Sequence, residues 1–111
     1  MIRAEIIRRK AAGDIVGYRV EGHALFADEG NDIVCAGVSA VAVGAVNAAE
    51  AVAGVKLLVR MEKGLLHAAV PDQVPDAARE KLETVLEAMT VMLRTIEKSY
   101  GSYIRIKEIY K

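Results

Sequence analysis

The fold is decided by residues 32–54, which read DIVCAGVSAVAVGAVNAAEAVAG. Asp32 is a residue type that caps the first free N–H groups of a helix, and Gly54 is the type that most often ends one. Between these two residues the sequence is almost free of charge. The pattern therefore predicts a helix over Ile33–Ala53. Its apolar surface and many small residues favour close approach by another backbone, either a sheet or a second subunit.

A hairpin is predicted before this helix. Residues 1–10 alternate apolar with charged side chains, which is typical of a strand. Residues 14–22 form a second strand pattern, with Val16, Tyr18 and Val20 on one face. A Gly-Asp turn separates the two segments, so they are predicted to pair as antiparallel strands.

The remaining elements follow the helix. Two apolar segments, 55–61 and 65–70, are joined by Glu-Lys-Gly and predict a second hairpin. A long amphipathic helix is predicted from Pro75 to Gly101, and a last strand over 103–110. The order ββαββαβ indicates a single α+β domain over residues 1–111, with two helices packed on a five-stranded sheet. The apolar stripe of the second helix is Leu82, Val85, Leu86, Met89, Leu93, Ile96 and Tyr100.

Composition argues against a nucleic-acid partner. The chain has 15 basic and 15 acidic residues, so it lacks the basic excess that phosphate binding requires. Aromatic residues make up only 5% of the sequence, which leaves little surface on which bases could stack. The one basic run, Arg8-Arg9-Lys10, is interpreted as a solvated strand end. We therefore expect no direct contact with nucleic acid.

The chain is expected to be a cytoplasmic protein without a membrane segment. No signal peptide opens it, because residues 1–10 contain no hydrophobic block. The uncharged stretch Ile33–Ala49 is mostly Ala, Val and Gly and is interpreted as a buried helix. The single cysteine excludes an intramolecular disulfide and a cysteine cluster for a metal, so no metal or cofactor is predicted.

Cys35 and His23 are the residues best placed for chemistry. Cys35 falls at the third position of the predicted helix, where free N–H groups and the helix dipole favour a thiolate. His23 follows the second strand, and the loop between them is long enough to bring the imidazole beside the sulfur. Taken by spacing alone, a lone cysteine on an apolar helix is more often an inert core residue. His67 lies within a strand and is interpreted as structural.

The sequence around these residues resembles the signature of the ribosomal-processing cysteine protease Prp family. The resemblance extends over nearly the whole chain. Gly37 and the bulky pair Leu25-Phe26 depart from the pattern expected of the family, but neither touches the two residues above. The matching elements are Gly22-His23-Ala24, Gly30, Asp32, Val34-Cys35-Ala36 and Val38-Ser39-Ala40.

This resemblance implies a dimeric endopeptidase. Its substrate would be the N-terminal extension of one large-subunit ribosomal protein, the twenty-seventh in the conventional series. Cys35 would be the nucleophile and His23 the general base, as a dyad without a third residue. Gly22, Gly30 and Asp32 would shape the loop, although Asp32 is explained as a helix cap as well. Ser39, one turn past Cys35, would touch the substrate or hold the loop.

Two other functions remain open at this point. A non-catalytic ribosome-associated or assembly module would use Cys35 as a core thiol and the loop 22–32 as a contact surface. The acidic residues Asp28 and Glu29 in that loop count against RNA as its partner. A thiol redox sensor would lack a second, resolving cysteine.

Overall fold

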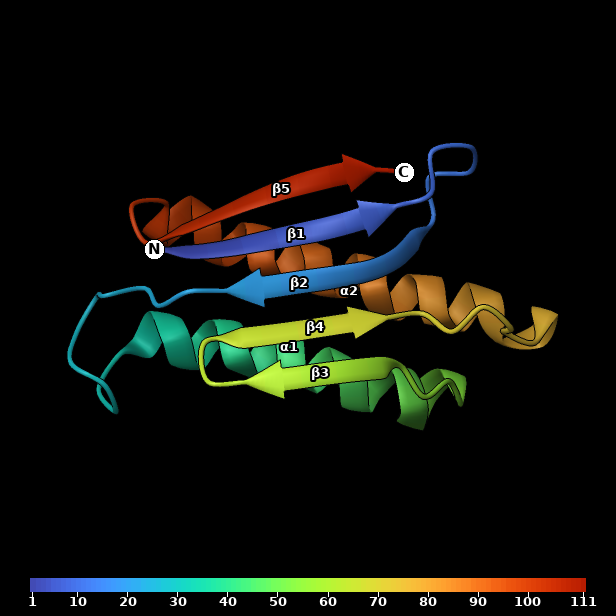
Figure 1. The fold of residues 1–111 in the computed structure, drawn as a ribbon, viewed down its shortest axis with the longest axis horizontal. Helices are drawn as coiled ribbons and strands as arrows, with labels where there is room; N and C mark the ends of the chain where they lie inside the picture. The colour runs from blue at the N-terminus through green and yellow to red at the C-terminus, as the bar shows by residue number, and fades with distance from the viewer.

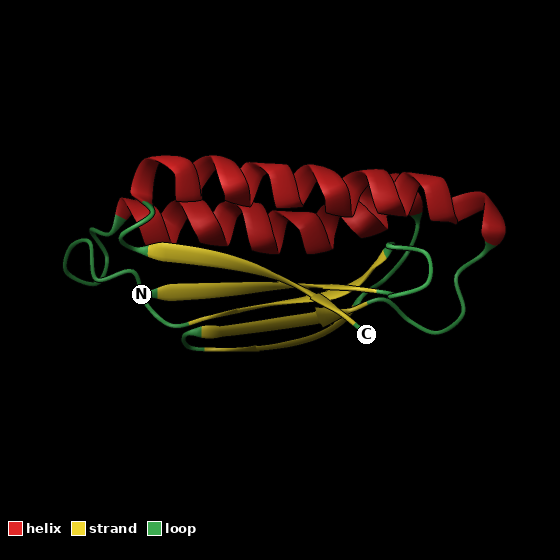
Figure 2. Ribbon diagram, turned by 90° about the horizontal axis from the view of Figure 1, so that it is seen from above, coloured by secondary structure: helices red, strands yellow, loops and turns green.

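The computed structural model describes residues 1–111, and its seven elements follow the predicted order ββαββαβ. The five strands form one sheet, and both helices cover the same face of it, so the molecule has two layers (Figure 2). The predicted α+β class is confirmed. The elements are β1 (Ile2–Arg8), β2 (Ile15–Glu21), α1 (Ile33–Ala53), β3 (Leu58–Glu62), β4 (Leu65–Ala69), α2 (Asp76–Tyr100) and β5 (Ile104–Tyr110).

The order of strands in the sheet is β3-β4-β2-β1-β5 (Figure 1). Only β1 and β5 run parallel; the other pairs are antiparallel. In this register Glu21, the last residue of β2, lies opposite both Arg3 of β1 and Leu65 of β4. The start of the chain, the loop after β2 and the β3–β4 turn therefore meet at one end of the sheet.

The two helix boundaries follow from local chemistry. Asp32 caps α1, and Gly54 ends it with a left-handed φ of 69°. The buried face of α1 consists of small and branched side chains, and α2 packs beside it (Figure 2). Short side chains on α1 allow both helices to lie close to the sheet. The buried residues of α1 are Val34, Val38, Ala42, Ala45 and Ala49.

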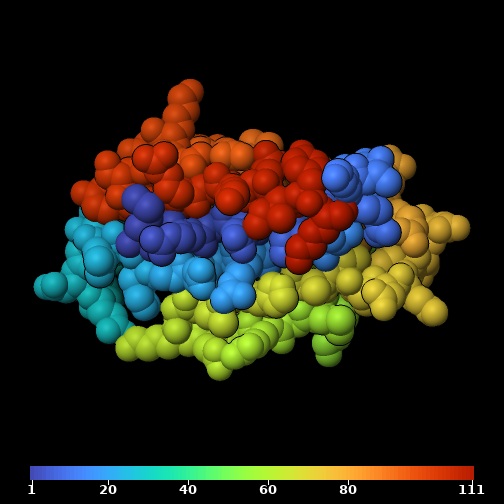
Figure 3. Space-filling model, turned by 45° about the horizontal axis from the view of Figure 1, so that its top comes forward, coloured from blue at the N-terminus to red at the C-terminus, as the bar shows by residue number.

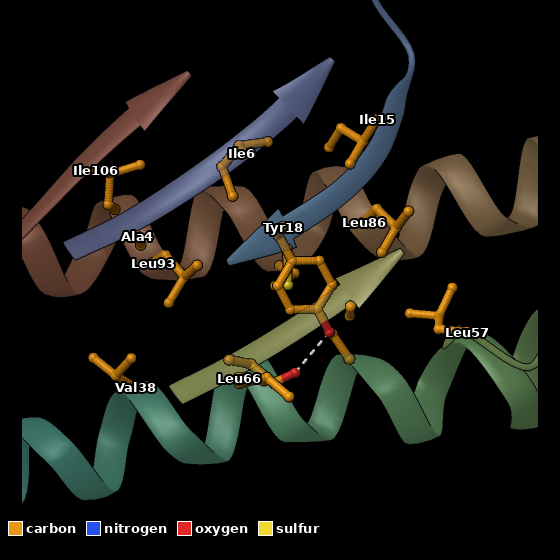
Figure 4. Packing of buried hydrophobic residues seen from close by; sticks show 14 of the residues in the cluster. Ala4, Ile6, Ile15, Tyr18, Val38, Leu57, Leu66, Leu86, Leu93 and Ile106 are labelled. Atoms are coloured by element: carbon orange, nitrogen blue, oxygen red, sulfur yellow. Dashed lines mark hydrogen bonds between the residues drawn. The ribbon is translucent and has the colours of Figure 1, made fainter. Parts of the chain in front are cut away.

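Tyr18 connects the two layers. Its side chain leaves β2, crosses the core and donates a hydrogen bond to the carbonyl oxygen of Ala42 in α1 at 2.8 Å (Figure 4). The ring is fully buried, and this burial raises the pKa of the Tyr18 hydroxyl. A buried hydroxyl that finds a partner in this way fixes where the helix lies on the sheet.

Two details of the strands differ from the sequence interpretation. Ile15, not Val16, shares the core face with Tyr18, because the register shifts between Ile7 and Arg8 and leaves Val16 as an extra residue. The third strand begins at Leu58 rather than at residue 55. Val55 and Leu57 lie in the connection before this strand; both are buried, but the connection pairs with no strand.

Arg8 is not the solvated residue that its basic run suggested. It follows Ile2, Ala4 and Ile6 on the core face of β1, where its guanidinium forms two hydrogen bonds to Glu87 of α2, at 2.6 and 2.8 Å. It also donates to Glu108 of β5 at 2.6 Å, and its side chain is only 12% exposed. Arg9 and Lys10 are exposed, as expected.

The outer face of the helix layer is apolar. A groove between α1 and α2 is lined by eight hydrophobic residues out of nine, among them Val41, Val85 and Met92. Met92 is 51% exposed there. By length and composition α1, with a mean hydropathy of 1.7, is also apolar enough to cross a membrane. In this fold its inner face packs on the sheet.

Candidate active site

A cavity of about 200 Å³ opens where α1 begins, beside the β3–β4 turn. Four of the residues singled out in the sequence, Gly22, His23, Cys35 and Ser39, line it together. Figure 3 shows the loop 22–32 (cyan) at this end of the molecule, with the yellow-green atoms of β3 and β4 near it. The fold therefore brings the end of β2, the first turns of α1 and the second hairpin to one place.

Cys35 is the third residue of α1 and is half-buried. Its sulfur accepts a hydrogen bond from the backbone N–H of Ala24 at 3.3 Å. An N–H group aimed at sulfur, together with the positive end of the helix dipole, stabilises negative charge on that atom. A helix start with an N–H group directed at the sulfur is the kind of setting in which reactive cysteines are found.

Asp32 holds both the helix and the loop. Its Oδ1 accepts the N–H groups of Val34 and Cys35, each at 3.0 Å, which is the expected cap. Its Oδ2 accepts the N–H groups of Phe26 and Ala27, at 3.0 and 3.3 Å. Partial burial raises the pKa of Asp32, but these four N–H groups together lower it below its ordinary value.

Two glycines give the loop its path. Gly22 has a φ of 92°, and a Cβ there would collide with the carbonyl oxygen of Met1. Only glycine therefore fits immediately before His23. Gly30 has a φ of 90° but open space around it, so it is needed only for its conformation. Leu25 is the one non-glycine residue with a positive φ, 58°, and marks backbone strain inside the loop.

The loop is also tied down on its far side. The ring of Phe26 packs edge-on against Tyr100 and Tyr103, with centroid distances of 5.7 and 5.1 Å. These two tyrosines end α2 and precede β5. Such aromatic pairs contribute about 0.5–1.5 kcal/mol beyond the area that they bury. The bulky residue that departs from the expected family pattern thus anchors the loop to the C-terminal part of the chain.

His23 is exposed and faces the same cavity as Cys35. No hydrogen bond joins the two side chains in this structure; the imidazole lies instead against Gly64 of the β3–β4 turn. Catalytic hydrogen bonds are often formed only when substrate is bound. His67 does not line the cavity and lies on β4, in register with Arg19 and Arg60.

Comparison with known proteins identifies the family. The family model described as cysteine protease Prp matches residues 1–105. The chain belongs to the cysteine protease Prp family. It is 40% identical to the ribosomal processing cysteine protease Prp of Bacillus subtilis, over 96% of each chain. The predicted family is therefore confirmed, and the chain is a cysteine peptidase of the Prp type.

Two solved Prp structures from Staphylococcus aureus have the same fold. One holds a covalently linked product peptide; it is 32% identical, with a TM-score of 0.86 over 100% of both chains. The other is in complex with a substrate peptide; it is 31% identical, with a TM-score of 0.81 over 100% of both chains. The fold thus holds a peptide ligand in those proteins.

Several features of the site could not be found by inspection of the sequence. Gly64 was noted only as a turn residue, and the contacts of Ala24 and Met1 depend on how the sheet brings the segments together. The second pair of hydrogen bonds to Asp32 likewise depends on how the loop folds back. The one local signal at Gly64 is a glycine in a hairpin turn, which indicates a positive φ but not the contact with His23.

Asp32→Asn should separate the two roles of this side chain. Asparagine also caps helices, so the free energy of unfolding should change by about 1 kcal/mol or less. Its amide nitrogen cannot accept hydrogen bonds, so one pair of N–H contacts is lost and the loop should loosen. We expect turnover to fall by about tenfold while the melting temperature changes little, as measured by peptide cleavage and thermal unfolding. Equal activity of the variant and the natural protein would contradict a role for Asp32 in holding the loop.

Proposed function

We propose that this chain removes a short N-terminal extension from one large-subunit ribosomal protein, the twenty-seventh in the conventional series, with Cys35 as nucleophile and His23 as general base. The observation that carries the proposal is that both side chains line one cavity at the start of α1. The relatives from Bacillus subtilis and Staphylococcus aureus are described as ribosomal processing proteases, which supports a ribosomal protein as the substrate class.

The reaction proceeds in two halves. His23 takes the proton of Cys35, and the sulfur attacks the scissile carbonyl carbon to form a C–S bond. The C–N bond then breaks, and the proton on His23 passes to the departing amine, which leaves a thioester on Cys35. Water attacks that thioester, His23 accepts the proton of the water, and the C–S bond breaks to release a carboxylic acid and the free thiol. These steps need only the dyad and water, so the proposal includes no metal or cofactor.

The lining of the cavity suits an apolar peptide segment. Val43 of α1, Met61 of β3 and Leu65 of β4 line it together with Cys35. β3 is the edge strand of the sheet and all of its residues are exposed, so a peptide leaving the cavity can lie along it. The substrate is thus held by apolar side-chain contacts and by the backbone of an edge strand.

The proposed activity is tested with the purified chain and a peptide that spans the extension and the first residues of the mature ribosomal protein. We expect one cut, which mass spectrometry detects as two products whose masses sum to that of the peptide plus water. A peptide of the same composition in scrambled order serves as control. Cleavage of both peptides alike, or of neither, would exclude the proposed substrate.

We further propose that the chain acts as a homodimer through the apolar groove between α1 and α2. Light scattering should give twice the 12.0 kDa mass of the chain at micromolar concentration. Met92→Glu places a charge in the groove and should shift the protein to a monomer. Lys107→Glu changes an exposed residue of β5 and should leave the dimer intact. A monomeric natural protein, or a dimer insensitive to Met92→Glu, would reject this interface.

We place the activity in the cytoplasm, where ribosomal proteins are made, and without direct contact to nucleic acid. The surface beside the cavity supports the second statement, because Asp28, Glu29 and Asp32 make the loop acidic. An acidic loop repels phosphate and favours a basic partner, such as a ribosomal protein.

A further inference from the structure

The imidazole of His23 lies so close to the β3–β4 turn that only glycine fits at residue 64. A Cβ built on Gly64 would lie 2.9 Å from Nε2 of His23, 3.3 Å from Cε1 and 3.7 Å from Cδ2. Three ring atoms at these distances mean that the imidazole covers the bare Cα of Gly64. A carbon at 2.9 Å is closer than van der Waals contact allows, so any side chain at residue 64 would push the ring away.

The same turn also holds the backbone that precedes His23. The carbonyl oxygen of Gly64 accepts the N–H of Gly22 at 2.9 Å, and the neighbouring Lys63 forms an ion pair with Glu29 at 3.1 Å. Both members of that ion pair are exposed, so it contributes little. The backbone hydrogen bond and the ring contact are therefore the two contacts through which this turn acts on the position of His23.

We infer that Gly64 is a positioning residue for His23: it sets the place of the imidazole at the mouth of the cavity that contains Cys35. The inference rests on the proposed function for its consequence in catalysis, but not for the contact itself. Gly64 has no functional group and acts only by leaving space and by offering its carbonyl oxygen. A base displaced by about 1 Å can cost on the order of 10²-fold in rate.

A second glycine of the chain provides a matched control. Gly13, in the β1–β2 turn, has a φ of 79°, close to the 75° of Gly64, but no atom lies within 4 Å of the position of its Cβ. Alanine therefore introduces the same backbone strain at both positions. Only at residue 64 does the added methyl group meet the imidazole. The difference between Gly64→Ala and Gly13→Ala isolates the contact with His23.

The first measurement follows His23 directly and needs no substrate. The chain has two histidines, so the imidazole C–H signals of His23 and His67 can be followed by NMR as the pH is varied. Gly64→Ala should move the signal of His23 and leave that of His67 in place. Gly13→Ala should move neither. An unmoved His23 signal in folded Gly64→Ala would overturn the inference, whatever the activity of the natural protein.

The second measurement compares cleavage of the extended ribosomal-protein peptide. Gly64→Ala should lower kcat on the order of 10²-fold, with little change in KM, whereas Gly13→Ala should keep the wild-type kcat. Equal melting temperatures of the two variants exclude general destabilisation as the cause. If the alanine variant does not fold, Gly64→Asn carries the same Cβ on a residue that tolerates positive φ. Wild-type kcat in a folded residue-64 variant, or an equal loss in both variants, would overturn the inference.

The two hypotheses fail in different ways. A natural protein that does not cut the peptide rejects the proposed function, and the NMR comparison still decides whether Gly64 positions His23. If the natural protein cuts the peptide and Gly64→Ala is fully active, the inference about Gly64 is rejected and the proposed function stands.

Discussion

Replacing Cys35 by alanine should abolish cleavage of the extended ribosomal-protein peptide while the protein stays folded. The substitution removes the only atom that can attack the scissile carbonyl, so the loss should be several orders of magnitude in kcat. The cost to stability is small, because the half-buried sulfur accepts one hydrogen bond, from Ala24. Such a bond contributes about 0.5–1.5 kcal/mol. Mass spectrometry of the peptide and thermal unfolding measure both quantities.

Cys35→Ser is the informative companion variant. Its hydroxyl can still accept the N–H of Ala24, so the loop keeps its contact. A serine hydroxyl is far less acidic than a thiol, however, and would need a stronger base than an imidazole without an orienting carboxylate. We expect this variant to be nearly as inactive as Cys35→Ala but to bind the peptide. Wild-type cleavage by either variant would require the dyad to be withdrawn.

The same pair of variants separates a peptidase from a binding module. A module that only recognises a ribosomal protein would be indifferent to the sulfur and would lose affinity when the loop 22–32 is changed. For a peptidase, removal of the sulfur leaves peptide affinity intact and eliminates the products. Peptide affinity and product formation, measured on the same sample, therefore give opposite patterns for the two functions.

The helices of this fold could be predicted because their ends carry chemical signals. Asp32 and Gly54 mark the two ends of α1, and Pro75 and Gly101 those of α2. Asp32 acts through the free N–H groups of a helix start, and Gly54 acts through a left-handed turn that side chains tolerate poorly. Pro75 supplies the fixed φ suited to a helix start, and Gly101 ends α2 in an ordinary helical conformation, with a φ of −61°. Their positions along the sequence therefore predicted the boundaries directly.

The strands were harder to assign in detail, because one extra residue reverses every side chain that follows. Alternation placed Val16 on the core face, but the register shift gives that place to Ile15. Arg8 keeps the inward direction of Ile2, Ala4 and Ile6, but its partners Glu87 and Glu108 belong to α2 and β5, far away in the sequence. Nothing near these residues in sequence signals the shift, because the strand partners and α2 determine where it is tolerated.

The candidate site was predictable as a set of residues but not as an arrangement. The spacing of His23, Asp32 and Cys35 indicated a loop that folds back on a helix start. The contact between His23 and Gly64 depends on the pairing of β2 with β4, whose residues lie more than 40 positions apart in the chain. Long-range pairing of this kind leaves no periodic trace in the sequence.

Replacing His23 by alanine should lower kcat by about 10²–10⁴-fold, the usual contribution of a general base. His67→Ala is the matched control, because it removes the only other imidazole, which does not line the cavity. That variant should retain the wild-type kcat. His23 is exposed, so its removal should change the melting temperature little.

The pH profile of His23→Ala distinguishes the loss of a general base from the loss of a substrate contact. Without an internal base, Cys35 can act only after its proton has gone to solvent, so the residual rate should rise steadily as the pH increases. Added imidazole should fit the space left at the cavity mouth and restore part of kcat, with no effect on the natural protein. KM should stay close to its wild-type value, because peptide contacts come from α1, β3 and β4. If KM rose while kcat was unchanged, His23 would be a substrate contact, and the proton transfer would have to be assigned to another group.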